Sequence, residues 1–337
     1  MNSKKLLKSW ACIAAGCAIA GALHAEPLKR SFCVWDPVGA NGPMYSLMKS
    51  SKPAAMKWGV DLELKPYTDE KIAAEDFKAG QCDSVLLTGT RAREFNKFTG
   101  SLEALGAIPS DDDMRTVLAT LSQAKASKYL QNGNYEVAGI VPAGAVYLFM
   151  RDRAVDSVEE LQGKKIATFD YDNAAMHMVR HVGASVVGSS SSSFAGKFNN
   201  GSVDVAYAPA VAYTPLELYK GLADHGGVID FKLAQMTFQV IIQRDKFPAD
   251  YAQNVRDFVS SKYDEAYELV ASAESDIKAD QWVKLAAANV EDYMKMFREV
   301  RIGLREDGVY DSSALKMFRI IRCKKNPTHA ECVEQTE

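Results

Sequence analysis

The chain has 337 residues, of which 47% are hydrophobic and 25% are charged, as is usual for a globular protein. This length allows two domains of usual size or one long one, and it can bury a core without metal or disulfide staples. The formal net charge is −3, and residues 1–25 hold three of the 40 basic residues and none of the 43 acidic ones, which leaves −6 for the remainder. An acidic body lacks the basic footprint of a nucleic-acid-binding protein, so no nucleic-acid partner is expected.

Residues 1–25 have the features of a secretory signal peptide. Its positive start contains Lys4, Lys5 and Lys8. The apolar run from Trp10 to Leu23 is too short to span a bilayer comfortably, and Ala25 offers a small residue at the cleavage site. An uncleaved anchor and lipidation at Cys17 are the alternatives. No apolar stretch of 18 residues follows residue 25, so we expect an exported protein whose signal peptide is cleaved and that forms no transmembrane pore by itself.

Four cysteines follow the expected signal peptide: Cys33, Cys82, Cys323 and Cys332. An even number in an oxidising compartment predicts two disulfides, and four cysteines allow three pairings. The short loop between Cys323 and Cys332 favours a local bridge, which leaves Cys33 to pair with Cys82. A metal site is the weaker alternative because no Cys-x-x-Cys motif occurs.

The first 90 residues of the body alternate between strands and helices. The expected elements are a strand over 31–35, a helix from Pro43, a strand over 60–67, a helix over 68–80 capped by Thr68, and a strand over 83–89. Short crossovers between these strands make the sheet parallel. A further helix is expected after Asp111–Asp113, since acidic residues favour a helix N-terminus.

A second α/β unit begins near residue 137. The expected elements are a strand over 137–151 interrupted at Pro142–Gly144, a short helix over 157–163, a strand over 165–171, a helix over 173–184, a strand over 184–188, a helix over 192–201, a strand over 203–209 and a strand over 236–248. Residues 249–322 are expected to be almost wholly helical. Large apolar residues recur there at helical spacing and are interpreted as core: Trp282, Tyr293, Met296, Phe297 and Phe318.

Two motifs resemble the solute receptors of TRAP transporters. The first has the pattern R-x-(I/V)-x-(S/T)-x-x-(D/E)-L-x-G-x-K-I, and the second is a G-A-x-x-V strand with a following serine-started helix and G-x-V-D segment. The matching residues are Arg153, Val155, Ser157, Glu160, Leu161, Gly163, Lys165, Ile166, Gly183, Ala184, Ser193, Gly201, Val203, Asp204 and Pro209. Residues 75–94 and 147–172 resemble most closely the AdeT-type solute-binding proteins.

The resemblance implies a two-lobed α/β periplasmic-binding-protein fold of type II with a helical C-terminal region. We expect α/β lobes over 26–140 and 141–235, a return to the first lobe with a helical wrap over 236–322, and a disulfide-closed tail over 323–337. The implied function is a receptor that captures a small molecule and delivers it to membrane permease subunits. By the same resemblance the protein would be a monomer without a cofactor.

One departure from the TRAP receptors concerns ligand charge. Those receptors usually place an arginine directly after the Lys-x-Ile strand start, where it clamps the carboxylate of the solute. Ala167 occupies that place here, and Tyr207 and Ala208 stand where the family often has polar residues. The resemblance therefore implies the receptor role without implying a carboxylate ligand.

Ligands of open α/β sheets bind at the carboxyl ends of the strands. This rule, with the strand that joins the lobes, selects Trp35, Asp36, Asn41, Thr88, Arg91, Tyr147, Arg151, Asp170, Tyr171, Asn173 and Tyr207 as ligand-binding candidates. Thr90, Asp172 and Pro209 lie at the same strand ends. The arginines suit an anionic group, the aromatic residues could stack on a ring, and the acids suit a cation or hydroxyls.

Each candidate also has a purely structural interpretation. Arg91 could pair with Glu94, and Arg151 with Asp152 or Glu159. The aspartates could cap the helices that follow them, and the aromatic residues could belong to the core.

Signals for catalysis are poor. His177 and His181 share a helical face, but no glutamate lies between them as a zinc protease requires, and an exposed face is the simpler interpretation. No G-x-S-x-G, Walker or G-x-G-x-x-G motif occurs. The serine run 189–193 is interpreted as a turn and cap.

Three function classes thus remain. A solute receptor is the leading one. An enzyme is disfavoured because the sequence shows no nucleophile–base pair and no metal-ligand cluster. A periplasmic accessory of a multidrug efflux system is disfavoured because such adaptors need long coiled hairpins, and this sequence has no sustained heptads.

Overall fold

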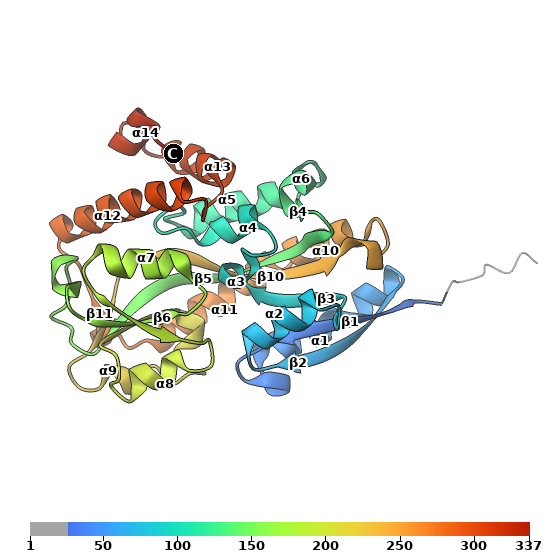
Figure 1. The fold of residues 1–337 in the computed structure, drawn as a ribbon, viewed down its shortest axis with the longest axis horizontal. Helices are drawn as coiled ribbons and strands as arrows, with labels where there is room; N and C mark the ends of the chain where they lie inside the picture. The colour runs from blue at the N-terminus through green and yellow to red at the C-terminus, as the bar shows by residue number, and fades with distance from the viewer. Residues whose placement is uncertain (1–25) are drawn as a thin grey trace, which may run out of the picture.

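A computed structural model describes residues 26–337, which form a mixed α/β structure around one sheet of eleven strands (Figure 1). Eight strands lie side by side in the order β2-β1-β3-β10-β5-β8-β6-β7. The expected signal peptide and its alternatives lie outside the described residues. Within residues 26–337, no helix is long and apolar enough to cross a membrane.

The strands are β1 (Leu28–Trp35), β2 (Val60–Tyr67), β3 (Ser84–Thr88), β4 (Gln131–Asn132), β5 (Tyr135–Met150), β6 (Lys165–Phe169), β7 (Ser185–Ser189), β8 (Val205–Pro209), β9 (Gly227–Ile229), β10 (Ala234–Gln243) and β11 (Trp282–Val283). The helices are α1 (Pro43–Lys57), α2 (Glu70–Lys78), α3 (Gly89–Ala92), α4 (Lys97–Gly100), α5 (Asp111–Leu121), α6 (Ser127–Leu130), α7 (Asn173–His181), α8 (Phe194–Asn199), α9 (Tyr219–Leu222), α10 (Tyr251–Ser260), α11 (Tyr263–Asp276), α12 (Ala287–Glu306), α13 (Ser312–Cys323) and α14 (Ala330–Glu334).

The β1 half of the sheet comprises β2, β1 and β3 with helices α1 to α4. β1 pairs in parallel with both neighbours, which confirms the parallel β-α-β-α-β arrangement predicted for the first 90 residues. The predicted cap of α2 is wrong by one residue. Asp69, and not Thr68, is the N-cap, because its carboxylate accepts from the backbone N–H groups of Lys71 and Ile72.

The centre of the sheet consists of the long strands β5 and β10, which pair antiparallel. The predicted interruption of β5 at Pro142–Gly144 is wrong, since the strand continues to Met150. Instead the register shifts, because Met236 pairs with Gly144 and Thr237 with Pro142, which leaves Ala143 as the extra residue of a bulge. Gly144 has φ +86° there, and a Cβ on it would lie 2.5 Å from Val270 Cγ1.

The β6 half comprises β8, β6 and β7 with α7, α8 and α9. Its three strands and the helices α7 and α8 occur where the sequence predicts them, whereas α9 is not among the predicted elements. Of the helix predicted over 157–163, only a 3-10 turn forms at Glu159–Leu161. β5 joins the halves, since its first part pairs with β10 and its last five residues pair with β8. The lobe boundaries expected near 140 and 235 fall inside these joining strands and stay a prediction.

The C-terminal region is helical, as predicted, with one interruption. The two-residue strand β11 separates α11 from α12 and pairs with β9. In Figure 1, α12 runs across the β6 half above α7, and α13 and α14 continue over the α4–α5 side. Four of the residues predicted to be core are buried, namely Tyr293, Met296, Phe297 and Phe318, and Trp282 is half-buried.

Both predicted disulfides are present. Cys33 in β1 is bonded to Cys82 before β3, with their Cα atoms 5.9 Å apart. Cys323 at the end of α13 is bonded to Cys332 in α14, with a Cα separation of 5.6 Å. The first bridge ties neighbouring parts of the β1 half together, and the second closes the C-terminal tail.

Candidate functional site

A cavity of about 140 Å³ lies where four strand ends converge. The last residues of β1, β3, β6 and β8 all line it: Trp35, Thr88, Phe169 and Pro209. The first two belong to the β1 half and the other two to the β6 half. The cavity therefore lies between the halves, at the edge of the sheet where ligands of open α/β folds bind.

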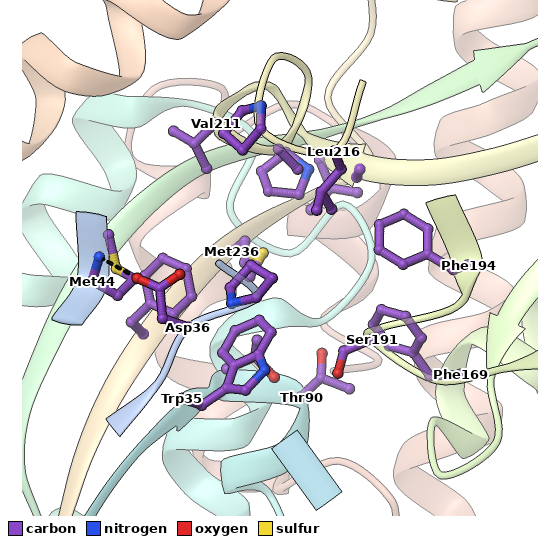
Figure 2. A pocket seen from close by; sticks show the side chains of 18 of the residues that line it. Trp35, Asp36, Met44, Thr90, Phe169, Ser191, Phe194, Val211, Leu216 and Met236 are labelled. Atoms are coloured by element: carbon purple, nitrogen blue, oxygen red, sulfur yellow. Dashed lines mark hydrogen bonds between the residues drawn. The ribbon is translucent and has the colours of Figure 1, made fainter. Parts of the chain in front are cut away.

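The walls of the cavity are mostly apolar (Figure 2). Aromatic residues come from both halves and from β10: Trp35, Phe169, Phe194, Tyr207 and Phe238. Aliphatic, methionine and proline side chains complete the walls, among them Met44, Val211, Pro215, Leu216 and Met236. Such a surface suits a small molecule with an apolar body.

Asp36 lines the cavity, but its carboxylate accepts hydrogen bonds from backbone N–H groups. It accepts from the N–H groups of Val38, Met44 and Tyr45 at 2.9, 2.8 and 3.1 Å, and so holds the first turn of α1. A Cβ on Gly42 would lie 1.9 Å from Asp36 Oδ1, so only glycine allows this close approach. The capping interpretation of Asp36 is confirmed.

Glu103 is a buried acid of the cavity that the sequence analysis missed. Its Oε1 accepts from the N–H and the hydroxyl of Thr237 at 2.8 and 3.1 Å, and its Oε2 accepts from the hydroxyl of Thr90. Burial raises the pKa of Glu103 to about 6, although these hydrogen bonds and the charge of Arg93 act to lower it. In the sequence, Glu103 is only a single acid within the apolar stretch 101–108, and no motif marks it as a site residue.

Two polar atoms among the lining residues have no hydrogen-bond partner in the part of the chain that the structure describes. They are Nε1 of Trp35 and the hydroxyl oxygen of Tyr207. Trp35 is only 6% exposed, and Figure 2 shows its indole beside Thr90 on the cavity wall. Buried donors are normally paired, so an unpaired N–H on the wall of a cavity indicates a place for a ligand acceptor.

A network at the edge of the cavity joins the two halves. The hydroxyl of Tyr171, after β6, donates to Glu70 Oε2 at 2.7 Å, and Glu70 Oε1 accepts from the N–H and hydroxyl of Thr88, each at 2.7 Å. The guanidinium of Arg91 lies 3.3 Å from the centre of the Tyr171 ring. Burial raises the pKa of Glu70 and, with the neighbouring Glu70 charge, that of Tyr171 well above its ordinary value.

A second link between the halves is the ion pair of Arg93 and Asp172, with Nη1 and Oδ1 3.4 Å apart. Asp172 also caps α7 by accepting from the N–H of Ala175, so its capping interpretation is confirmed. Arg91 does not pair with Glu94, which instead pairs with Lys78.

The structure brings four of the eleven ligand candidates to the cavity wall: Trp35, Asp36, Thr88 and Tyr207. Thr90 and Pro209 line it too. Arg91 and Tyr171 meet each other at its edge, as described above. Ligand binding by any of these residues stays a prediction.

The other five candidates lie elsewhere. Tyr147 donates to Glu274 Oε1 at 2.6 Å, and Arg151 donates to the carbonyl oxygens of Phe198 and Gly221. The remaining three are exposed and do not line the cavity: Asn41, Asp170 and Asn173. Ala167, at the place of the TRAP arginine, is buried in the apolar cluster of the β6 half and does not line the cavity either.

The histidines and serines singled out in the sequence have structural partners. His177 and His181 on α7 face Asp307 and Glu299, at 4.0 and 3.5 Å, where the C-terminal helices pack on α7. In the serine run, Ser193 Oγ accepts from the N–H of Ser190, which makes the predicted turn, and Ser191 lines the cavity. No group of three or more metal-ligating side chains occurs among residues 26–337.

Solved structures of TRAP periplasmic solute-binding proteins share this fold. One from Desulfovibrio salexigens with bound orotic acid matches with a TM-score of 0.73 and 13% identity, over 88% of this chain and 99% of that one. Another from Shewanella oneidensis with bound succinate matches with a TM-score of 0.69 and 12% identity, over the same shares. The protein thus has the mixed α/β fold of TRAP solute receptors with a helical C-terminal region, as predicted.

The particular family follows from sequence. The solute-binding protein AdeT 1/2 family matches residues 43–337, and the chain belongs to that family. The probable solute-binding protein AdeT1 of Acinetobacter baumannii is 40% identical over 304 residues, which are 90% of this chain and 100% of the relative. AdeT2 of the same organism is 26% identical over 233 residues, 69% of this chain and 98% of the relative. The predicted resemblance is confirmed, and the family is one of non-enzymatic solute-binding proteins.

Proposed function

We propose that this protein is a periplasmic receptor that captures a small molecule in the cavity between the β1 and β6 halves and delivers it to a membrane permease. The observation that carries the proposal is the convergence of four strand ends, two from each half, on one apolar cavity with unpaired polar atoms. A ligand there would contact both halves at once, so its binding energy would favour the arrangement in which they are close.

The joining strands suit a hinge. The halves are connected through β5 and β10, whereas the pair Tyr171–Glu70 and the pair Arg93–Asp172 are side-chain contacts between them. Opening about the joining strands would break these contacts without breaking either half.

Related proteins support the small-molecule ligand. The TRAP proteins of similar fold hold orotic acid and succinate. The same proposal includes membrane permease subunits as partners and a monomeric state, both of which rest on the resemblance to TRAP receptors. It also includes a cleaved signal peptide, which rests on residues 1–25.

Native mass spectrometry of mature protein purified from the periplasm tests this function. A small mass that remains bound under native conditions and leaves on gentle unfolding supports the receptor and gives the mass of the solute. A bare protein that co-purifies with an outer-membrane channel would contradict it and favour the efflux accessory.

A further inference from the structure

The cavity between the halves offers acids and neutral polar groups but no base. Among its lining residues in the described chain, Asp36 and Glu103 are acidic and none is Lys, Arg or His. Of the two arginines at its edge, Arg93 pairs with Asp172, whereas Arg91 stacks on Tyr171, and neither lines the cavity. A carboxylate solute would therefore face Glu103 with no cationic side chain on the cavity wall, at a considerable cost in a low-dielectric site.

Glu103 has capacity for one more donor. A carboxylate offers about four acceptor positions, and Thr90 and Thr237 together fill three of them. Asp36 differs, because its three backbone donors are the constitutive caps of α1. Glu103 is thus the acid of the cavity that suits a ligand donor.

The walls around Glu103 suit a cation with an apolar body. Trp35 and Phe238 form one aromatic pair with ring centres 6.0 Å apart, and Phe169 and Tyr207 form another at 6.1 Å. The negative faces of such rings attract ammonium groups, and their area covers an apolar body.

We propose that the solute of this receptor is a compact apolar amine, bound as the ammonium ion with its charge against Glu103 and its body between the two aromatic pairs. This inference rests on the receptor function proposed above and names the class of its solute. The cavity volume of about 140 Å³ resembles that of apolar cavities of about 150 Å³ that bind benzene, so a phenyl-sized body fits.

Isothermal titration calorimetry on the mature chain with three matched probes tests the charge of the solute. The probes are 2-phenylethylamine, the neutral 2-phenylethanol and the anionic 3-phenylpropanoate. At about pH 7.5 we expect the amine to bind at least about tenfold more tightly than the acid, as one charge-assisted hydrogen bond predicts. Equal or tighter binding of the acid overturns the inference.

The variant Glu103→Gln tests the named residue. Glutamine keeps the side-chain shape and an acceptor for Thr237, so we expect affinity for 2-phenylethylamine to fall about tenfold while that for 2-phenylethanol stays within about threefold. Glu268→Gln, at an exposed acid of α11, is the matched control and should leave the three affinities unchanged. Unchanged amine affinity in Glu103→Gln, with the fold checked by circular dichroism, overturns the assignment.

The outcomes separate this inference from the receptor function. Preference for the acid rejects the amine and keeps the receptor. If no probe binds, the inference fails, and the native mass spectrum then decides whether the receptor function stands.

Discussion

The hydroxyl of Tyr171 donates a 2.7 Å hydrogen bond to Oε2 of Glu70, across the gap between the two halves of the sheet. Tyr171 follows β6, and Glu70 opens α2 in the β1 half. Because the other oxygen of Glu70 accepts from Thr88 on the cavity wall, this contact connects the β6 half to the wall of the candidate site.

Replacing Tyr171 by phenylalanine should open the molecule. The variant leaves a buried carboxylate short of one donor, which should lower the free energy of unfolding by about 2 kcal/mol. Because the lost bond joins the halves, we also expect a larger radius of gyration in small-angle X-ray scattering.

Tyr213→Phe is the matched control for Tyr171→Phe. It removes a 2.7 Å bond from Tyr213 to Gln281, which does not connect the β1 half to the β6 half. We expect it to lower stability without changing the scattering curve. Identical curves for both variants and the parent protein would contradict the link between this contact and closure.

Stability should depend on pH through Glu103. Its folded-state pKa is raised by burial from 4.5 to about 6, so the folded protein holds a proton that the unfolded chain has already released. The stabilisation from this proton on Glu103 is fully present below about pH 4.5 and is lost as the pH rises towards 6. The free energy of unfolding then falls by about 2 kcal/mol, at 1.36 kcal/mol per pKa unit.

Urea unfolding of the parent protein and of Glu103→Gln between about pH 4 and 7 measures this change. The difference between their free energies of unfolding should shift by about 2 kcal/mol in favour of the variant as the pH rises. The control Glu268→Gln should show a constant difference. If the stability curves of the parent protein and of Glu103→Gln stay parallel over this pH range, the Glu103 carboxyl titrates normally and the prediction is wrong.

The side chain of Glu337 should be important for stability. Arg301 is fully buried, and its guanidinium donates to Glu337, Glu331 and the carbonyl of Leu105 at 2.6, 2.7 and 2.7 Å. Burial acts to raise the pKa of Glu337, but the charges of Arg301 and Arg322 outweigh it and lower that pKa.

We therefore expect Glu337→Ala to lower the free energy of unfolding by about 3 kcal/mol, because it leaves one buried carboxylate, Glu331, to balance the two cations Arg301 and Arg322. Glu334→Ala should cost at most about 1 kcal/mol, since that carboxylate is 54% exposed and pairs with Arg298 at the surface. Urea unfolding at neutral pH measures both, and equal losses would refute the special role of the buried cluster.

The two disulfides should contribute unequally. The bridge Cys33–Cys82 spans 49 positions and Cys323–Cys332 spans 9. Loop-closure entropy then predicts losses of about 4 and about 3 kcal/mol for the respective double serine variants. Thermal unfolding of both variants checks the order, and a larger loss for the tail bridge would show that native-state contacts, not loop length, dominate.

Local signals allowed much of the fold to be predicted. The alternation in VDLELKPY places β2 at Val60–Tyr67, because one face of that strand must be buried. Pro43 marks the start of α1, and Asp36 and Asp172 cap helices, because these effects act within a few residues of the chain. The bulge in β5 is predicted as an interruption of the strand, since only pairing with β10 shows that the strand continues through it.

The candidate site was only partly predictable, because the sequence shows local signals but not contacts between distant residues. Strand ends such as Trp35 and Tyr207 follow from the sheet rule, whereas Glu103 and Glu70 become notable only through burial among distant neighbours. Arg91 and Tyr171 were each selected as ligand groups, but they are 80 positions apart, and their contact with each other could not be seen in the sequence.

The sequence by itself determined the order of most strands and of the longer helices, the disulfide pairs and the family, because periodicity, caps, cysteine spacing and motifs are encoded locally. The tertiary structure decided which acid lies in the cavity, which arginines are engaged elsewhere and how the halves are linked. Those properties depend on desolvation and on charge pairs between residues such as Glu103 and Thr237, which only folding brings within hydrogen-bonding distance.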